Sequence, residues 1–430
     1  MKPQSKRLKD VHARALTRFN AIYTTVRDER EQCLEDRRFY SVVGAQWEGG
    51  LGEQFENKPM FEMNKVHLAV IRVVNEYRNN RITVDFTSKD GVENDKLADA
   101  CDGLYRADEQ DSGAQEAYDN AFEEAAAGGF GAWRLRARYE DDDDEDDTRQ
   151  RIDMEPIHDA DSCVFFDLNC KRQDKRNAKF CFVLNGMTRD AYKEEYDDSP
   201  EDWGRDINRT GFDWAAGDVV YVAEYYEVEE FTELMHVYRG LALGDDEPNE
   251  QRIGDEDLMA DDGKRKTELE ATGFREVRQK RITRKRIHKY QLSGGSVLKD
   301  EGIIAGRRIP IIPVFGKRWF VDGVERLMGH VRLAKDAQRL KNMLVSWLAD
   351  ISSKSPVSKP IVTPEQMLGH TSMWSRDNVD DYPYLMLNGL VDQNGQAMPA
   401  GPIGYTKAPE IPQALAALLA ITEQDLQDLL

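Results

Sequence analysis

The sequence lacks the features of several large classes of protein. No apolar stretch approaches the ~18–20 residues that a membrane-spanning helix needs, and the polar start, Met1 to Lys9, has no apolar stretch of the kind found in signal peptides. The cysteines are odd in number and form no CxxC pair: Cys33, Cys101, Cys163, Cys170 and Cys181. These absences exclude a membrane protein and a secreted disulfide scaffold, and they indicate reduced thiols in a cytosolic setting.

The motifs of common enzymes are absent as well. Gly316-Lys317 lacks both the upstream Gly and the following Ser or Thr of a phosphate-binding loop, and neither G-x-S-x-G nor H-E-x-x-H occurs. The glycines from Gly128 to Gly131 precede a strand pattern and lack the order of a dinucleotide-binding turn. We therefore expect no catalytic activity and no cofactor.

Candidate metal ligands are sparse. The nearest candidates for a zinc site are Cys163, Cys170, Cys181 and His158, but Cys163 and Cys181 alternate with apolar residues as strand residues do. We expect no metal site. Acidic groups such as Asp255–Asp257 leave a metal-dependent nuclease open as an alternative function, although a chain with 80 acidic residues contains such groups by chance.

Charge, mostly negative, is what the chain has in abundance. Its 59 Lys and Arg stand against 80 Asp and Glu, which gives a net charge of −21, and charged residues make up 32% of the 430 residues. The hydrophobic share of 40% suffices for a large core, divided among roughly two to four domains. Such an acidic surface repels nucleic acid at long range, which argues against a protein that simply coats DNA.

Apolar periodicity predicts an α+β fold. Residues at three- and four-residue steps predict helices over 8–38, from Asn64 to about 78, over 94–108 and over 114–127. Stretches rich in β-type residues predict strands over 82–86, 133–139, 163–166, 179–184 and 219–228. Eight consecutive acidic residues, Glu140 to Asp147, indicate a solvated loop between two strands.

The sharpest change in composition begins at Arg275. From Arg275 to Lys289, eight cations accompany a single acid, Glu276, with β-type apolar residues between them. This run, the turn at 293–295 and a strand over 309–315 indicate a small strand-rich module inserted between two helices. The run is either a solvated face or a surface for phosphate groups or an acidic partner.

The helix after this module is the most regular in the chain. Its apolar stripe runs over 323–352 and predicts a rod of roughly 45 Å, whose other face carries cations that include Arg332, Lys335 and Arg339. A last amphipathic helix over 411–430 has no C-cap residue, so we expect the chain to be cut inside a helix.

Several short motifs stand in a fixed order along the chain. They are Phe39–Trp47, Asn75–Arg81, Ala121–Trp133, Arg278–Arg281, Ile309–Val314, Gly316–Phe320, Asp336–Arg339, Gly404–Thr406 and Gln413–Leu415. No single motif is diagnostic, but the ordered set resembles the portal (head-to-tail connector) protein of short-tailed, lambdoid-type tailed bacteriophages. The similarity runs through essentially the whole chain.

The resemblance implies a portal fold with an α/β wing, a long helical stem, a small strand-rich clip and the start of a helical crown. The implied segments are a wing at 1–254, a first stem helix at 255–272, a clip at 273–320, a second stem helix at 321–353, a channel loop with a return to the wing at 354–410 and the start of a crown helix at 411–430. Members of the family continue with more crown beyond this point.

The resemblance also implies a structural, non-enzymatic role at one vertex of the capsid, in a virion assembled in the host cytoplasm. Portal proteins of this family form a homo-oligomeric ring of about twelve subunits, through which the double-stranded DNA genome is packaged and ejected. The implied partners are the major capsid protein, the scaffolding protein, the large subunit of the terminase motor and tail adaptor proteins. No membrane partner is implied.

Three groups of residues are expected to carry this function. The side of the stem that meets DNA or a partner is expected to hold Arg332, Lys335 and Arg339. The clip is expected to dock the motor and adaptors through Arg278, Lys280, Arg281 and Arg284. Packing between the stems of neighbouring subunits is expected from Leu327, Val331, Leu340, Leu344 and Trp347.

Two alternatives stay open on the sequence alone, the nuclease above and a scaffold or adaptor protein without a channel. The net charge of −21 agrees with a channel. Each phosphate contact adds affinity through counterion release, so a mostly acidic ring with its cations confined to one helix face and one module guides DNA without gripping it.

Overall fold

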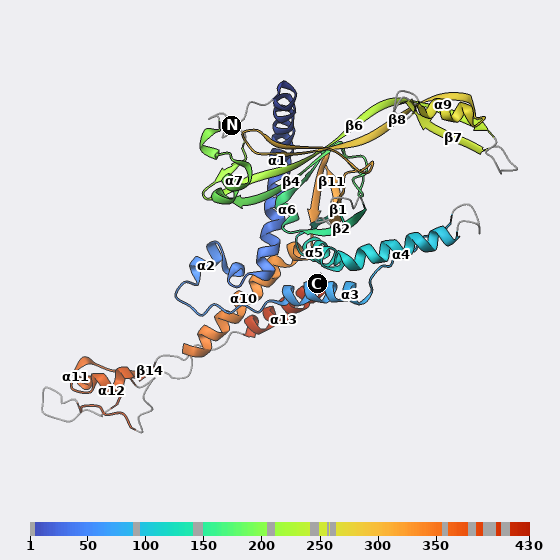
Figure 1. The fold of residues 1–430 in the computed structure, drawn as a ribbon. Coiled ribbons are helices and arrows are strands. Elements are labelled where there is room, and N and C mark those ends of the chain that lie inside the picture. The colour runs from blue at the N-terminus through green and yellow to red at the C-terminus, as the bar shows by residue number, and fades with distance from the viewer. Residues whose placement is uncertain are drawn as a thin grey trace. The chain divides into compact units, whose positions relative to one another are not determined.

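The chain divides into two compact units (Figure 1). The first consists of Met1–Arg38 and Leu68–Arg332, and the second of Phe39–His67 and Leu333–Leu430. The computed structural model describes residues 5–88, 95–140, 149–203, 211–240, 249–255, 258, 264–354, 360–376, 384–389, 401–405 and 413–430. The predicted acidic loop, apart from Glu140, lies outside these residues. No helix in the described ranges is long and apolar enough to cross a membrane.

Helices occur in both units. Three of them contribute residues to both: α1 (Lys6–Ser41), α3 (Lys65–Asn79) and α10 (Val331–Lys354). The first unit also contains α4 (Asp95–Asp111), α5 (Ala114–Ala127), α6 (Ala160–Cys163), α7 (Arg189–Tyr196), η3 (Pro200–Asp202) and α9 (Lys264–Ala271). The second unit also contains η1 (Ala45–Trp47), α2 (Gly50–Gln54), α11 (Pro364–Met367), α12 (Thr371–Arg376) and α13 (Gln413–Leu429).

The described strands all pair antiparallel, as in α+β proteins. A seven-stranded sheet has the order β3 (Val164–Phe166), β4 (Phe180–Thr188), β6 (Val219–Gly240), β8 (Arg275–Leu292), β9 (Val297–Ile304), with β5 (Ala215–Ala216) and β7 (Asn249–Gly254) also paired to β6. A three-stranded sheet has the order β10 (Ile311–Phe315), β1 (Phe130–Tyr139), β2 (Gln150–Ile157). The short pairs are β11 (Lys317–Val321) with β12 (Val324–Met328), and β13 (Pro360–Ile361) with β14 (Gly404–Tyr405).

The seven-stranded sheet is covered on both faces. On one face it packs against α1, where the ring of Phe19 is fully buried and lies 5.4 Å from the rings of both Phe165 and Phe182. Successive residues of a strand point to opposite faces, so Cys181, next to Phe182, belongs to a second core that includes Phe130 of β1. This two-sided burial explains why β4 begins with a continuous apolar run.

Helix α5 packs very close to β1 because its inner face is built from alanine. The buried residues include Ala114, Ala117, Ala121 and Ala125. A Cβ on Gly131 would lie 2.0 Å from the carbonyl oxygen of Ala121. Only glycine fits at this position of β1.

In the second unit, α10 carries a row of buried polar side chains. Gln338, Asn342 and Ser346 lie four residues apart and are at most 1% exposed. They accept hydrogen bonds from alternate backbone N–H groups of the segment that leads into α3: Lys65 to Gln338 (3.2 Å), Met63 to Asn342 (3.0 Å) and Phe61 to Ser346 (2.9 Å). The side chains of this row thus supply the hydrogen-bond acceptors that these backbone N–H groups would otherwise find in a neighbouring strand.

The long helices agree with the prediction from sequence. Helix α5 has the predicted bounds, and α1 runs three residues beyond the predicted end at 38. The N-cap role of Asn64 is confirmed, because its Oδ1 accepts a hydrogen bond of 2.9 Å from the backbone N–H of His67. Strands β1 and β6 cover their predicted positions, and β6 extends further, to Gly240. Strands β3 and β4 each begin one residue later than predicted, and Cys163 belongs to α6.

Two predicted elements are wrong. Residues 82–86 form neither helix nor strand, and Ile82 is 86% exposed, because β-type residues form a strand only where a neighbouring strand pairs with them. The helix predicted from Gly323 begins at Val331, since Gly323, with φ +78°, lies in the turn of the β11–β12 hairpin. The 24 residues of α10 therefore span about 36 Å.

The basic segment does not form a sheet of its own. Strand β8 pairs with β6 along its whole length, and β10 pairs with β1, so both strands belong to larger sheets. Helix α9, where the first stem helix was expected, has eight described residues and a length of about 12 Å.

Candidate interaction surfaces

Strands β6 and β8 continue past the rest of the seven-stranded sheet as a two-stranded arm (Figure 1). Strand β4 pairs with β6 only as far as Glu227, and β9 pairs with β8 only from Ile287 onward. We define the arm as Glu229–Gly240, β7, α9 and the part of β8 up to Arg286. Strand β7 pairs with the end of β6 and widens the arm there.

Much of the basic run is neutralised by β6 and its neighbours. Carboxylates stand opposite the cations across the strand pair, an arrangement that stabilises antiparallel strands. The ion pairs are Arg284–Glu233 (2.9 Å), Lys285–Glu230 (3.1 Å), Arg286–Glu229 (2.9 Å) and Lys289–Glu301 (2.9 Å). The acidic positions of β6 were the available sequence signal, but they lie some 50 residues away and only the strand register matches them with the cations.

Three of the four cations expected to dock partners remain available to a partner. Arg278, Lys280 and Arg281 are exposed and form no ion pair with any described residue. Because side chains alternate along a strand, Arg278 and Lys280 lie on one face of β8 and Arg281 on the other. We call these three residues the arm cations. Arg284, expected to act with them, is bound to the buried carboxylate of Glu233.

The end of the arm has a small core of its own. Its buried members are Tyr238, Ile253, Leu258, Leu269 and Phe274. Beside this core, His236 lies between the carboxylates of Glu276, at 2.7 Å, and Asp255, at 3.4 Å. The hydrogen bond from His236 holds the pKa of Glu276 below its usual value. The described residues at the end of the arm therefore form a folded core.

Arg332, expected to face DNA or a partner, lies in an ion network of the first unit. Its Nε donates to Asp36 Oδ2 and its Nη1 to Glu29 Oε1, both at 2.8 Å. The side chain of Asp36 is fully buried and that of Glu29 is 6% exposed. Burial opposes the charge on Arg332, but these two carboxylates outweigh it and raise the pKa of the guanidinium. The positive charge of Arg332 is thus already compensated.

Lys335 and Arg339 lie over an aromatic ring in the second unit. The Lys335 ammonium is 5.8 Å and the Arg339 guanidinium 5.3 Å from the centre of the Phe39 ring, which is 2% exposed. Both side chains are half-buried. The face of this ring therefore helps to orient both cations.

The residues expected to pack between subunits differ in exposure. Leu327 belongs to β12 and is 3% exposed, and Val331 and Leu344 of α10 are also buried within the chain. Leu340 is half-buried, whereas Trp347 is 41% and Leu333 57% exposed. Surface for a neighbour is therefore available at Trp347, Leu340 and the previously unnoticed Leu333.

The cysteines do not form a metal centre in the part of the chain that the structure describes. No group of three or more His, Cys, Asp or Glu side chains within that part is placed to hold a metal ion. All five cysteines are free. Burial raises the pKa of the Cys33 thiol to about 11 and that of Cys163 to about 12, which leaves both thiols protonated and unreactive at neutral pH.

Comparison with known proteins agrees with the ordered motifs. The family described as "Phage P22-like portal protein" matches residues 16–430. One curated relative, the portal protein of Acyrthosiphon pisum secondary endosymbiont phage 1, is 38% identical over 426 residues. That match covers 97% of this chain and 58% of the relative, so the chain spans little more than half the relative's length. Because the family match extends over nearly all of its residues, this chain belongs to the phage P22-like portal protein family.

Proposed function

We propose that this chain is the subunit of a homo-oligomeric ring that forms the DNA channel at one vertex of a phage capsid. The observation that carries the proposal is the match to the portal family over residues 16–430. The ring has about twelve copies and a structural, non-enzymatic role in packaging and ejecting double-stranded DNA. Its partners are the major capsid and scaffolding proteins, the terminase large subunit and tail adaptors, and it is assembled in the host cytoplasm before becoming part of the virion.

The arm is the docking end of the subunit in this proposal. Its three arm cations are exposed on two faces of a strand pair and have no described ion-pair partner, so their charges can meet an acidic partner surface. We assign clip function to the outer half of the arm, with α9 and β7. The first unit otherwise supplies the wing.

Helix α10 supplies the stem helix and the cations nearest to DNA. Of the three cations expected there, Lys335 and Arg339 fit this role because both are partly exposed and the Phe39 ring orients them. Arg332 is assigned to folding. Trp347, Leu340 and Leu333 supply the apolar contact to the next subunit, and such a head-to-tail contact closes into a ring.

Reversing the α10 cations tests the channel assignment. In phage carrying Lys335→Glu with Arg339→Glu, we expect a lower yield of packaged DNA with rings of normal size. The matched control is Lys6→Glu with Lys9→Glu, two exposed cations at the start of α1 whose reversal changes the charge equally. Normal packaging by the α10 variant would contradict the assignment, as would an equal loss in the control.

Removing the arm cations tests the docking assignment. Arg278→Ala, Lys280→Ala and Arg281→Ala together are expected to weaken capture of the terminase large subunit by purified rings, because the contact loses its charge-assisted hydrogen bonds. Lys6→Ala with Lys9→Ala serves as the control. Unchanged capture by the arm variant would count against the arm as the docking end.

A further inference from the structure

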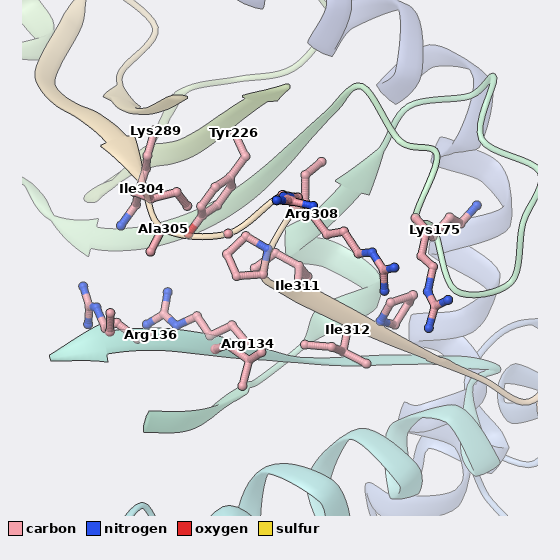
Figure 2. Close-up of a pocket in the computed structure, with 18 of the residues that line it drawn as sticks. Arg134, Arg136, Lys175, Tyr226, Lys289, Ile304, Ala305, Arg308, Ile311 and Ile312 are labelled. Carbon is pink, nitrogen blue, oxygen red and sulfur yellow. The ribbon is translucent and has the colours of Figure 1, made fainter. Parts of the chain in front are cut away.

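A basic groove lies in the first unit, between the edges of its two sheets (Figure 2). The segment 305–310 leaves β9, an edge strand of the seven-stranded sheet, and enters β10, an edge strand of the three-stranded sheet. The groove beside it has a volume of about 1310 Å³. Figure 2 shows Arg134 and Arg136 on β1, Arg308 on the connecting segment, and Lys175 on a separate loop.

Cations outnumber carboxylates in the lining of the groove although the chain is acidic. Eight cations line it: Arg134, Arg136, Arg172, Lys175, Arg176, Lys289, Arg307 and Arg308. Only three carboxylates do so: Asp174, Glu224 and Glu301. A positive concavity on a chain with a net charge of −21 concentrates the field that attracts an anionic partner.

The three carboxylates are already bound to cations of the groove. Glu224 lies 3.3 Å from Arg134 and 3.5 Å from Lys289, and it accepts a hydrogen bond of 2.8 Å from the Tyr226 hydroxyl. Asp174 is bound by Arg172 at 2.8 Å and by Arg176 at 3.0 Å. Glu301 accepts from Lys289 at 2.9 Å and from Gln291 at 2.6 Å. No carboxylate of the groove is left to neutralise its remaining cations.

Two further cations of the groove are bound by carboxylates outside its lining, Arg136 by Glu155 at 3.4 Å and Lys175 by Glu325 at 2.9 Å. Arg307 and Arg308 are the cations that remain. Both side chains are exposed, and neither forms a hydrogen bond or ion pair with the described part of the chain. They follow Gly306, whose φ of +105° makes the sharp turn out of β9. Each arginine therefore offers a guanidinium fork to a carboxylate or a phosphate.

The apolar part of the lining distinguishes between these two anions. Ile304, Ile309 and Ile312 are half-buried, and Pro310 and Pro313 stand beside them. Interfaces with nucleic acid are predominantly polar and gain from exposed aromatic faces for stacking, but the aromatic residue of this groove, Tyr226, is 4% exposed. A row of isoleucines and prolines instead suits the apolar side chains of a peptide.

The two strands that border the groove favour an extended peptide. β9 and β10 each pair on one side only among the described strands, so each has a sheet edge to which a further strand can add. We propose that the groove binds an extended acidic segment of a partner protein, with carboxylates on Arg307 and Arg308 and apolar side chains against the isoleucines. This site is separate from the arm and from α10, and the proposal does not rest on their functions.

Fluorescence anisotropy with short labelled peptides tests the proposal on the full-length protein. A peptide of alternating Glu and Leu is expected to bind more tightly than peptides of alternating Glu and Ser or Lys and Leu. Arg307→Glu with Arg308→Glu is expected to weaken this binding about tenfold or more. Lys6→Glu with Lys9→Glu at the start of α1 changes the net charge equally and is expected to leave the affinity unchanged. Ile304→Ser is expected to weaken binding of the Glu–Leu peptide alone.

Several outcomes would overturn the proposal. Equal losses of affinity in the groove variant and the Lys6/Lys9 variant would show that the effect comes from net charge alone. Tighter binding of a single-stranded or duplex oligonucleotide, lost in the Arg307/Arg308 variant, would make the groove a nucleic-acid site. Replacing residues 141–147 by Gly and Ser is expected to leave the affinity unchanged, and tighter peptide binding instead would identify the chain's own acidic run as the occupant. A photoreactive Glu–Leu peptide that labels only segments other than 134–137, 172–176 and 304–313 would also refute it.

Discussion

Replacing Arg332 with Ala removes the guanidinium at the centre of a buried ion network. Besides Asp36 and Glu29, Arg332 Nη1 also donates to the carbonyl oxygen of Leu327, at 2.8 Å. The carboxylates left behind are at most 6% exposed, so they lose this partner without gaining water. Removing one partner of a buried ion pair costs about 3–5 kcal/mol. At about 2–4 °C per kcal/mol, the melting temperature of the first unit falls by roughly 6–20 °C.

The pH dependence of this loss follows from Glu29. Burial opposes ionisation of its carboxyl, but hydrogen bonds from Arg332, from the Leu327 N–H and from Arg326 outweigh burial and hold its pKa below the usual 4.5. A lowered carboxyl pKa stabilises the fold above pH 4.5, and that stability is lost as the pH falls through the folded-state value. The stability gap between wild type and Arg332→Ala is therefore full at neutral pH and narrows in acid.

Thermal melting followed by circular dichroism at several pH values measures this gap. Arg326→Ala is the matched control, because Arg326 also binds Glu29, at 3.0 Å, but its side chain is 42% exposed, and exposed ion pairs contribute about 0–1 kcal/mol. A loss for Arg332→Ala no larger than for the control would refute the reasoning. So would a gap that widens in acid.

Three further predictions concern folding. Asn342→Ala removes the acceptor of the Met63 N–H and the donor to Gln46 Oε1 (2.6 Å). Urea unfolding is expected to show a free energy of unfolding lower by about 2–4 kcal/mol, and unchanged stability would contradict the role of the polar row. Gly131→Ala is expected to lower the free energy of unfolding by about 3 kcal/mol or more. Gly103 is exposed in α4, with no atom near the position of a Cβ, so Gly103→Ala is expected to raise the free energy of unfolding by about 0.5–1 kcal/mol. Equal effects would contradict the close packing of α5. His12 forms a hydrogen bond of 2.9 Å with the Ser293 carbonyl, and burial lowers the pKa of its imidazole below 6.5. The free energy of unfolding is therefore expected to fall as the pH drops below 6.5, and to fall less in His12→Gln. Identical pH profiles of stability for the two proteins would refute this.

The periodicity of apolar residues correctly predicted the helices that bury one apolar face and carry their own end signals. Helix α5 carries its own stop signal in Gly128-Gly129, and α1 buries the predicted face around Phe19, so both were predictable. The start of α10 was not. Val324 and Leu327 fit the helical stripe and the β12 strand equally well, and only pairing with β11 decides between them.

The sequence predicted which segments carry positive charge, but not which of those charges are free to contact a partner. The basic run was recognised, but the carboxylates that neutralise part of it come from β6 and are matched to it by strand register. Arg332 was expected at the surface because its partners, Glu29 and Asp36, stand some 300 positions earlier. The buried row of Gln338, Asn342 and Ser346 follows helical spacing but has the composition of a solvated face, so sequence alone did not indicate it.

Electron microscopy of the purified full-length protein tests the central claim most directly. The account predicts closed rings with a central hole wide enough for a DNA duplex, and with the arms of successive subunits at one end. Trp347→Ala is expected to shift particles from rings toward free subunits, because Trp347 supplies apolar contact to the neighbour. Compact monomers without a hole, from the unaltered protein at the concentrations used for assembly, would contradict the account.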